Sequence, residues 1–336
     1  MKISYLEVNN SSACSRIRRV CFTLTLLVVF DIHTGVHAEG IEEASGITRL
    51  DDMLLIVGDK TPGAYYTYPL AKVQEPLITL DPALQTKIQL PHGAAALDLE
   101  GIAVLVDGRV VVLSERLRAL VGAQGIIAEY GTPLTEFGNR GLEGVAVVPD
   151  GQGGSRVAVL WEGGYPDYEQ MPQELRHIVG RPPLRPVIWI HTIPRGEAKL
   201  HVWSTQVQSI EMQVPVPDQT DPPNGHRFRA PDLIWHRWKG QNQDELGFIV
   251  LLSSENSPIN RKPEFRRYQW LQRFRLDGKP YGEPLDLAAL LPEDLRDRNW
   301  EGLGWYVAGE ELVIVHDAPP YGTPSAYILA IPDTWH

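Results

Sequence analysis

The chain has almost no cysteine: Cys14 and Cys21 are its only two, and both lie near the start. The rest of the chain can therefore form no disulfide and offers no thiolate nucleophile, so its stability must come from a hydrophobic core. Long apolar runs are scarce as well. The run from Val20 to Phe30 has 11 residues, which is short of the ~20 that a membrane-spanning helix needs. We therefore expect no membrane span in the mature chain.

The first 38 residues have the order of a secretory signal peptide. Three arginines between positions 16 and 19 precede the apolar run, and Val36-His37-Ala38 places small or modest residues at a cleavage site. A membrane anchor is the alternative interpretation, and the short run speaks against it. We expect cleavage near Ala38, a mature domain over residues 39–336, and a periplasmic or secreted location.

Basic residues are outnumbered. The whole chain has 31 Lys and Arg against 42 Asp and Glu, and loss of residues 1–38 leaves 27 against 40, a net charge of about −13. Nucleic acids and anionic membranes attract basic surfaces, so neither is expected as a partner. A small-molecule ligand or a divalent cation suits this charge better, although an acidic surface can also serve solubility alone.

Common catalytic signatures are missing. The sequence contains no Gly-x-Ser-x-Gly elbow, no His-Glu-x-x-His helix, no phosphate-binding glycine loop and no EF-hand loop. If the protein is a hydrolase, its water must be activated by a metal ion or by a carboxylate base.

A repeated hairpin dominates what is present. Its clearest copy runs from Leu99-Glu100-Gly101 through an Asp107-Gly108 turn to Ser114-Glu115. Asp-Gly between two apolar runs predicts a tight β-hairpin, since glycine accepts the positive φ of such turns. Similar copies begin at residues 45, 143, 232 and 301.

Five such hairpins, each followed by one or two outer strands, predict an all-β propeller with five four-stranded antiparallel blades in a single domain. The wide interval between residues 143 and 232 leaves room for a sixth blade, and a β-sandwich is the competing fold. We expect a long loop over 163–185 in that interval, with Val187–Ile193 and Leu200–Trp203 as outer strands of the third blade.

Two further local predictions follow from the pattern. The segment Gly40–Ala44 is expected to close the ring as the fourth strand of the last blade. Helical periodicity is confined to Arg116–Val121 and Leu287–Arg296.

Acidic residues stand at both ends of these hairpins. The first residue of one strand and the last residue of its partner occupy the same end of a hairpin, so these residues should share one rim of the channel. The expected pairs are Glu100 with Glu115, Glu143 with Glu162, Asp232 with Glu255, and Glu301 with Asp317. Ser45 takes the matching position in the first blade.

Gathered carboxylates repel one another unless a cation joins them, and oxygen-rich sites favour hard ions. Calcium accepts six to eight oxygen ligands in loose geometry, so we predict a Ca²⁺ site formed by the four strand-start residues Glu100, Glu143, Asp232 and Glu301. The alternative for each acidic residue is a hydrogen bond to the backbone of the neighbouring blade.

Other residues are candidates for substrate contact. His226, Arg227 and Arg229 precede the fourth hairpin and could meet an anionic group. The hairpin-end acids Glu115, Glu162, Glu255 and Asp317 are further candidates for substrate binding. No catalytic residue is identified. The candidates are Glu100, Glu143 and His226, and no organic cofactor is implied.

With its repeated Glu-Gly-apolar starts and Ser-Glu ends, best seen at Leu99-Glu100-Gly101 and Ser114-Glu115, the chain resembles exported propellers of the phytase-like, esterase-like-activity group. It is more distantly similar to SdiA-regulated-type propellers. The resemblance implies a metal-dependent hydrolase of phosphate or carboxylic esters. A non-catalytic ligand-binding or scaffolding propeller is the alternative hypothesis.

Overall fold

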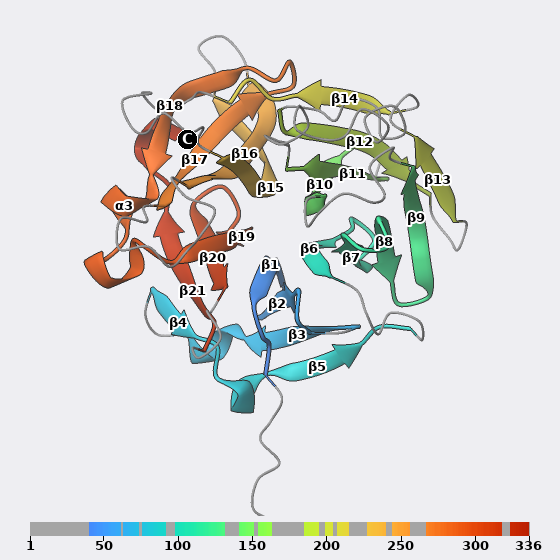
Figure 1. Cartoon of the computed structure of the whole chain (residues 1–336), viewed down its shortest axis with the longest axis horizontal. Coiled ribbons are helices and arrows are strands. Elements are labelled where there is room, and N and C mark those ends of the chain that lie inside the picture. The colour runs from blue at the N-terminus through green and yellow to red at the C-terminus, as the bar shows by residue number, and fades with distance from the viewer. Residues whose placement is uncertain are drawn as a thin grey trace, which may run out of the picture. The chain divides into compact units, whose positions relative to one another are not determined.

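Five β-sheets are arranged in a ring around a common axis in the computed structural model (Figure 1). The prediction of an all-β, five-bladed propeller is confirmed, and no sheet in the described residues forms a sixth blade. The structure describes residues 40–61, 63–73, 76–91, 98–131, 141–150, 154–162, 185–194, 199–203, 207–214, 227–239, 244–255, 267–317 and 323–335.

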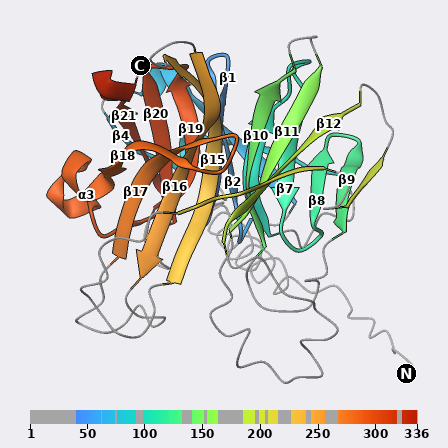
Figure 2. The ribbon, with the colours of Figure 1, turned by 90° about the horizontal axis from the view of Figure 1, so that it is seen from above.

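Each blade begins with an inner strand beside the channel and continues outward. Figure 2 shows the blades edge-on, with their strands running roughly along the channel axis. From the inside outward, the blades are: blade 1, β1 (Ala44–Leu50), β2 (Met53–Gly58), β3 (Ala64–Pro69) and β5 (Thr86–Gln89); blade 2, β6 (Leu99–Val104), β7 (Val110–Ser114), β8 (Ala119–Gly122), β9 (Gly125–Gly131) and β13 (Leu200–Trp203); blade 3, β10 (Leu142–Pro149), β11 (Ser155–Trp161), β12 (Val187–Ile193) and β14 (Gln208–Glu211); blade 4, β15 (Arg227–Lys239), β16 (Asp244–Glu255), β17 (Arg267–Arg275) and β18 (Pro280–Asp286); blade 5, β19 (Asn299–Val307), β20 (Glu311–Asp317), β21 (Ser325–Ala330) and β4 (Leu77–Thr79).

The ring closes through β4, not through Gly40–Ala44 as the sequence predicted. β4 lies in the connection between β3 and β5 of blade 1, and it pairs antiparallel with β21 at the outer edge of blade 5. Ile78 of β4 packs into the same apolar cluster as Val313 and Ala326 of blade 5. The first and last blades are thereby joined by backbone hydrogen bonds and by a shared core.

A second correction concerns β13. The sequence assigned Leu200–Trp203 to blade 3, but this strand pairs in parallel with β9 at the edge of blade 2. The outer position in blade 3 belongs to β14, which pairs with β12, and the assignment of Val187–Ile193 to blade 3 is correct. Most of the predicted loop over 163–185 lies outside the described residues.

One of the two helical predictions is wrong. Arg116–Val121 forms no helix, because a turn there leads into β8. The second segment does contain α3 (Leu287–Leu290) and a 3-10 turn at Glu293–Leu295. In the described part of the chain, no helix has the length and apolar character needed to cross a membrane.

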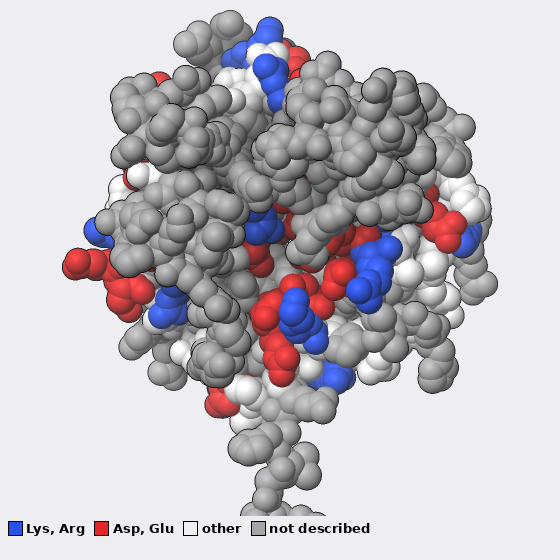
Figure 3. Space-filling model, in the orientation of Figure 1, with Lys and Arg blue, Asp and Glu red and all other residues white. Residues whose placement is uncertain are grey.

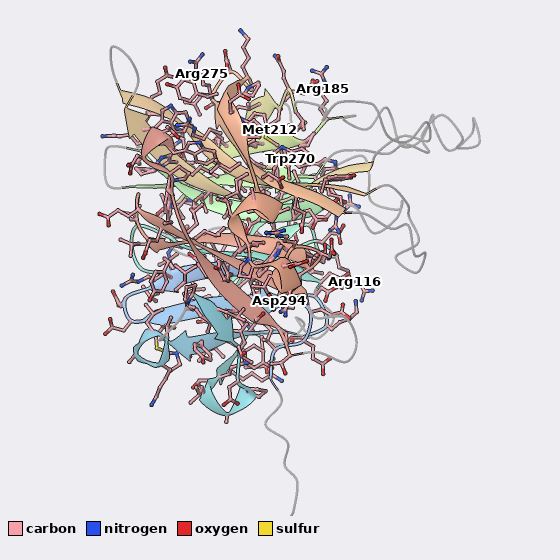
Figure 4. The ribbon with its side chains drawn as sticks, turned by 90° about the vertical axis from the view of Figure 1, so that its left-hand side faces the viewer. Arg116, Arg185, Met212, Trp270, Arg275 and Asp294 are labelled. Atoms are coloured by element: carbon pink, nitrogen blue, oxygen red, sulfur yellow. The ribbon has the colours of Figure 1, made fainter. Side chains whose placement is uncertain are left out.

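The core lies between the blades. Met212 and Trp270, which are close together in Figure 4, belong to the apolar cluster that joins blades 3 and 4. Trp161 fills the interface of blades 2 and 3, and Trp300 fills that of blades 4 and 5, both fully buried. Burial of tryptophans on this scale contributes roughly 2 kcal/mol or more per side chain, which fits a chain stabilised without disulfides.

Candidate functional site

The acidic residues are aimed at the channel by a shared irregularity. The antiparallel register of the inner hairpin shifts at Glu100 in blade 2, at Glu143 in blade 3 and at Glu301 in blade 5, each time just before a glycine. Blade 1 has the same shift at Ser45. A bulge takes one residue out of the ladder and redirects its side chain. The repeated Glu-Gly pair therefore encodes a bulge that turns a carboxyl group toward the axis.

The glycines permit close approach of neighbouring inner strands. A Cβ placed on Gly46 would lie 2.6 Å from the backbone oxygen of Glu100, and one on Gly302 would lie 2.8 Å from that of Ser45. Both distances are too short for any larger residue without displacement of the backbone. The inner strands consequently approach one another closely at the level of the acidic residues, which brings side chains from different blades together.

Arg229 of β15 is the centre of this cluster. Its Nε lies 3.1 Å from Glu162 Oε2, one Nη lies 3.3 Å from Glu301 Oε1, and the other lies 3.8 Å from Glu143 Oε2. Its side chain is 28% exposed. Burial disfavours the charged guanidinium, but Glu162, Glu301 and Glu143 outweigh this and hold the pKa of Arg229 above its usual range. One guanidinium thus connects carboxylates from blades 3 and 5 to blade 4.

Figure 3 shows acidic side chains, with basic side chains among them, around the centre of this face. Glu100 and Glu143 start neighbouring inner strands there. Burial raises the pKa of both carboxyl groups well above the ordinary range. The charges of Glu301, Glu115 and Asp59 raise the pKa of Glu100 further, and those of Glu162, Glu100 and Glu115 raise the pKa of Glu143. Glu143 is only 4% exposed. Burial and neighbouring negative charge both favour the protonated form of such carboxyl groups.

Glu115 belongs to the same face. Burial, followed by the charges of Glu162 and Asp98, raises its pKa to about 7. Its side chain passes over Gly141, where an added Cβ would come within 2.7 Å of the Glu115 carboxylate. The glycine before β10 therefore makes room for this residue. The hairpin-end acids Glu115 and Glu162 lie beside the strand-start acids, as the sequence predicted from hairpin geometry.

Asp232 differs from the other acidic residues. In blade 4 the register shift falls on Ala230 and Pro231, since proline has no N–H to pair, and Asp232 is paired opposite Leu251. Its two carboxylate oxygens accept hydrogen bonds from the backbone N–H of Leu233 at 2.8 Å and of Leu303 at 2.7 Å. The second bond joins blade 4 to blade 5. This is the structural alternative that the sequence left open for each acidic residue.

Blade 1 supplies charged residues that the sequence prediction omitted. Burial raises the pKa of Asp59 to about 7, its Oδ2 lies 3.0 Å from Lys60 Nζ, and its charge is one of those that raise the pKa of Glu100. Lys60 also lies 3.1 Å from Glu43 Oε2. The signal was present: Asp59 follows β2 as Glu115 follows β7. In blade 5, the Asn299 amide donates to Glu301 Oε1.

Several predicted contacts are outside what the structure describes. His226 is not among the described residues, and for Arg227, Glu255 and Asp317 only the backbone pairing is described. Arg227 and Glu255 face each other in the register of β15 and β16, and Asp317 faces Asn299. Their roles stay predictions.

The residues predicted to bind calcium do not fit a divalent ion in this arrangement. Both oxygens of Asp232 are occupied by backbone amides, and Arg229 contacts two of the other three, Glu143 and Glu301. Within the described residues, no three His, Asp or Glu side chains form a group that could hold a metal ion. The Arg229 guanidinium supplies the positive charge that calcium was predicted to supply. Calcium binding stays a prediction from the sequence, and it would require Arg229 to move away from Glu143 and Glu301.

Several solved structures align with most of this chain at low similarity. Virginiamycin B lyase from Staphylococcus aureus aligns with 11% identity and a TM-score of 0.38, covering 86% of this chain and 95% of that one. A gluconolactonase from Xanthomonas campestris aligns with 11% identity and a TM-score of 0.36, covering 87% of each chain. A luciferin-regenerating enzyme gives 9% identity and a TM-score of 0.35, covering 89% of this chain and 94% of that chain.

No protein-family model matches the chain, and no curated protein sequence matches it significantly. The likeness to the phytase-like group therefore stays a prediction from short motifs. Similarities at this level of identity and TM-score name neither a family nor a substrate. What can be stated plainly is that the chain is a five-bladed β-propeller.

Proposed function

We propose that this protein is an exported hydrolase of small carboxylic esters, with Glu100 and Glu143 as an acid–base pair at the acidic mouth of the channel. The observation that supports the proposal is that both carboxyl groups have raised pKa values, that the charge of Glu100 contributes to the raised pKa of Glu143, and that the Arg229 guanidinium lies 3.8 Å from Glu143. Strongly perturbed carboxyl groups that meet in a channel mouth are typical of sites that transfer protons.

The chemistry requires only the residues of this mouth. The ionised member of the pair removes a proton from a water molecule, whose oxygen attacks the ester carbonyl carbon. The protonated member then donates its proton to the departing alcohol oxygen, so that an acid and an alcohol are released. The Arg229 guanidinium is placed to stabilise negative charge on the carbonyl oxygen during the attack.

Carboxylic esters suit the site better than phosphate esters. The mouth carries Glu100, Glu115, Glu143, Glu162 and Glu301, and Arg229 is the basic residue that contacts three of them. A phosphate monoester with two negative charges would be repelled by the carboxylates that Arg229 does not neutralise. Neutral or cationic esters meet no such barrier.

The test is turnover of p-nitrophenyl acetate and p-nitrophenyl butyrate, with p-nitrophenyl phosphate for comparison, in EDTA and in CaCl₂. We expect ester turnover in both media and little phosphate turnover. Glu100→Gln and Glu143→Gln should each lower kcat by about 100-fold or more. Glu245→Gln is the matched control, because Glu245 forms an ion pair with Arg275, away from the acidic residues of the mouth. Unchanged rates in both channel variants would refute the proposal.

A second candidate, ligand binding without turnover, is favoured by one observation. The ion pairs of Arg229 join blades 3, 4 and 5 and so would be useful for stability alone. In that case a cationic or neutral ligand should raise the melting temperature without being consumed. Product formed in the same mixture would decide for the hydrolase.

A further inference from the structure

A separate cavity opens at the opposite end of the channel. All five inner strands run away from the acidic mouth, and residues in their later parts enclose a space of about 470 Å³. This volume falls within the usual range for sites that bind small organic molecules. The cavity is distinct from the acidic cluster, because none of the glutamates that contact Arg229 lines it.

The walls of this cavity differ from side to side. Blades 2 and 3 contribute aliphatic side chains, among them Val104 and Val147. Blades 4 and 5 contribute Trp235, Trp305 and Tyr306. All five of these side chains are half-buried, so each leaves part of its surface open. A slot between aliphatic and aromatic walls favours a flat apolar group, which can stack on the rings.

The aromatic wall is held in place by its own contacts. Trp305 Nε1 donates a hydrogen bond of 3.1 Å to the backbone oxygen of Trp235, and the ring of Trp305 lies 5.1 Å from that of His236. Trp235 packs edge-on against Phe248 at 5.3 Å. A ligand would therefore meet surfaces that are already ordered, which lowers the entropic cost of binding.

The rim of the cavity carries one charge of each sign. Arg49 is exposed, donates from Nε to the backbone oxygen of Asp51 at 2.8 Å and from one Nη to that of Tyr306, and lies over the Tyr306 ring at 5.8 Å. Neutral carbonyls fix the guanidinium without cancelling its charge. Asp51 lines the same rim and is exposed as well.

From this arrangement we propose that the cavity binds a planar aromatic zwitterion of the size of an aromatic amino acid. The ring lies between the aliphatic and aromatic walls, the carboxylate meets Arg49, and the ammonium group meets Asp51. The proposal does not rest on ester hydrolysis, since it involves none of the residues assigned to that reaction.

The test is calorimetric titration of the mature protein with four probes that share the indole ring. L-Tryptophan has both charges, indole-3-propionate has the carboxylate alone, tryptamine has the ammonium alone, and 3-methylindole has neither. We expect L-tryptophan to bind most tightly and 3-methylindole least tightly, with about a tenfold loss in affinity for each charge removed, as a charge-assisted hydrogen bond would give.

Three variants make the test specific. Arg49→Gln should weaken L-tryptophan and indole-3-propionate but not tryptamine. Asp51→Asn should weaken L-tryptophan and tryptamine only, and asparagine tolerates the positive φ of 49° at this position. Val104→Trp, or Val147→Trp should the first variant misfold, fills the slot and should abolish binding. Glu245→Gln is the control.

Saturable binding in this order, with these variant effects, would support the proposal. The proposal is overturned if none of the probes binds, if the filled variant binds as well as the natural protein, or if neither rim variant changes the ranking of the probes. Since none of these variants alters the acidic mouth, ester turnover can fail while this binding is found, and the reverse.

Discussion

The two ends of the channel are built from the same five strands but have opposite chemistry. At one end, bulges direct Glu100, Glu143 and Glu301 toward the axis, and Arg229 contacts Glu143 and Glu301. At the other end, the same strands present Val104, Val147, Trp235 and Trp305 around an open cavity. Regular strands bury or expose side chains by alternation alone, whereas a bulge redirects a single residue, so the acidic end required a specific backbone irregularity.

Among the variants that change the acidic end of the channel, removal of Arg229 should have the largest effect on stability. Arg229→Met leaves Glu143, Glu162 and Glu301 without their shared cation, and we expect the free energy of unfolding to fall by about 3 kcal/mol. Thermal denaturation measures the loss. Arg275→Met, which removes an ion pair with Glu245 at the surface, should cost well under 1 kcal/mol.

The same variant sharpens the prediction about metals. With the guanidinium gone, CaCl₂ should raise the melting temperature of Arg229→Met, while the natural protein should show no such rise. An equal rise in both proteins would mean that calcium binds with Arg229 in place, and would restore the calcium site that the sequence predicted.

Asp232 tests whether the acidic residues act as one group. Asp232→Asn keeps one oxygen for the amides of Leu233 and Leu303 and loses the other, so stability should fall by roughly 1–2 kcal/mol. Because Asp232 bonds to backbone and not to the cluster, the pH dependence of ester turnover should stay the same. A shifted pH profile would place Asp232 among the residues of the acid–base site.

The smallest expected effect concerns pH and Glu115. Its folded-state pKa of about 7 lies above the ordinary glutamate pKa of 4.5, so the folded state binds more protons than the unfolded state between these values. Stability should therefore fall as pH rises from about 4.5 to about 7. Part of this fall, on the order of 1 kcal/mol after allowance for solvent screening, should disappear in Glu115→Gln. Melting curves at several pH values with no difference between the two proteins would contradict the assignment.

The fold could be predicted from the sequence because a similar hairpin pattern recurs in each blade. Three Glu-Gly-apolar starts, together with the related starts at Ser45 and Asp232, predicted the five inner strands. Hairpin geometry placed Glu115 and Glu162 beside Glu100 and Glu143. Both predictions depend on local pattern. A hairpin brings its own ends together whatever the rest of the chain does.

The errors concern contacts between distant segments. β4 and β13 are short strands of three and four residues at the outer edges of their sheets. Their amino-acid composition does not indicate which blade they join. Asp232 was predicted to act with the glutamates because it begins a similar hairpin. It differs from them in the structure because the bulge falls at Pro231, one residue earlier. Arg229 was predicted to contact substrate from a loop. That it lies in β15 and pairs with residues 67 and 72 positions away is a product of ring closure.

Carbon-13 NMR of the labelled glutamate carboxyl groups tests the central claim most directly, namely that Glu100 and Glu143 interact at the channel mouth so that one of them is protonated at neutral pH. The spectrum is recorded on the Glu115→Gln variant, because Glu115, with a pKa of about 7, would itself be partly protonated at pH 7. This spectrum should contain the signal of a protonated carboxyl group, and the signal should disappear or titrate elsewhere when Glu143→Gln is added. A spectrum in which every glutamate is ionised at pH 7 would contradict the claim.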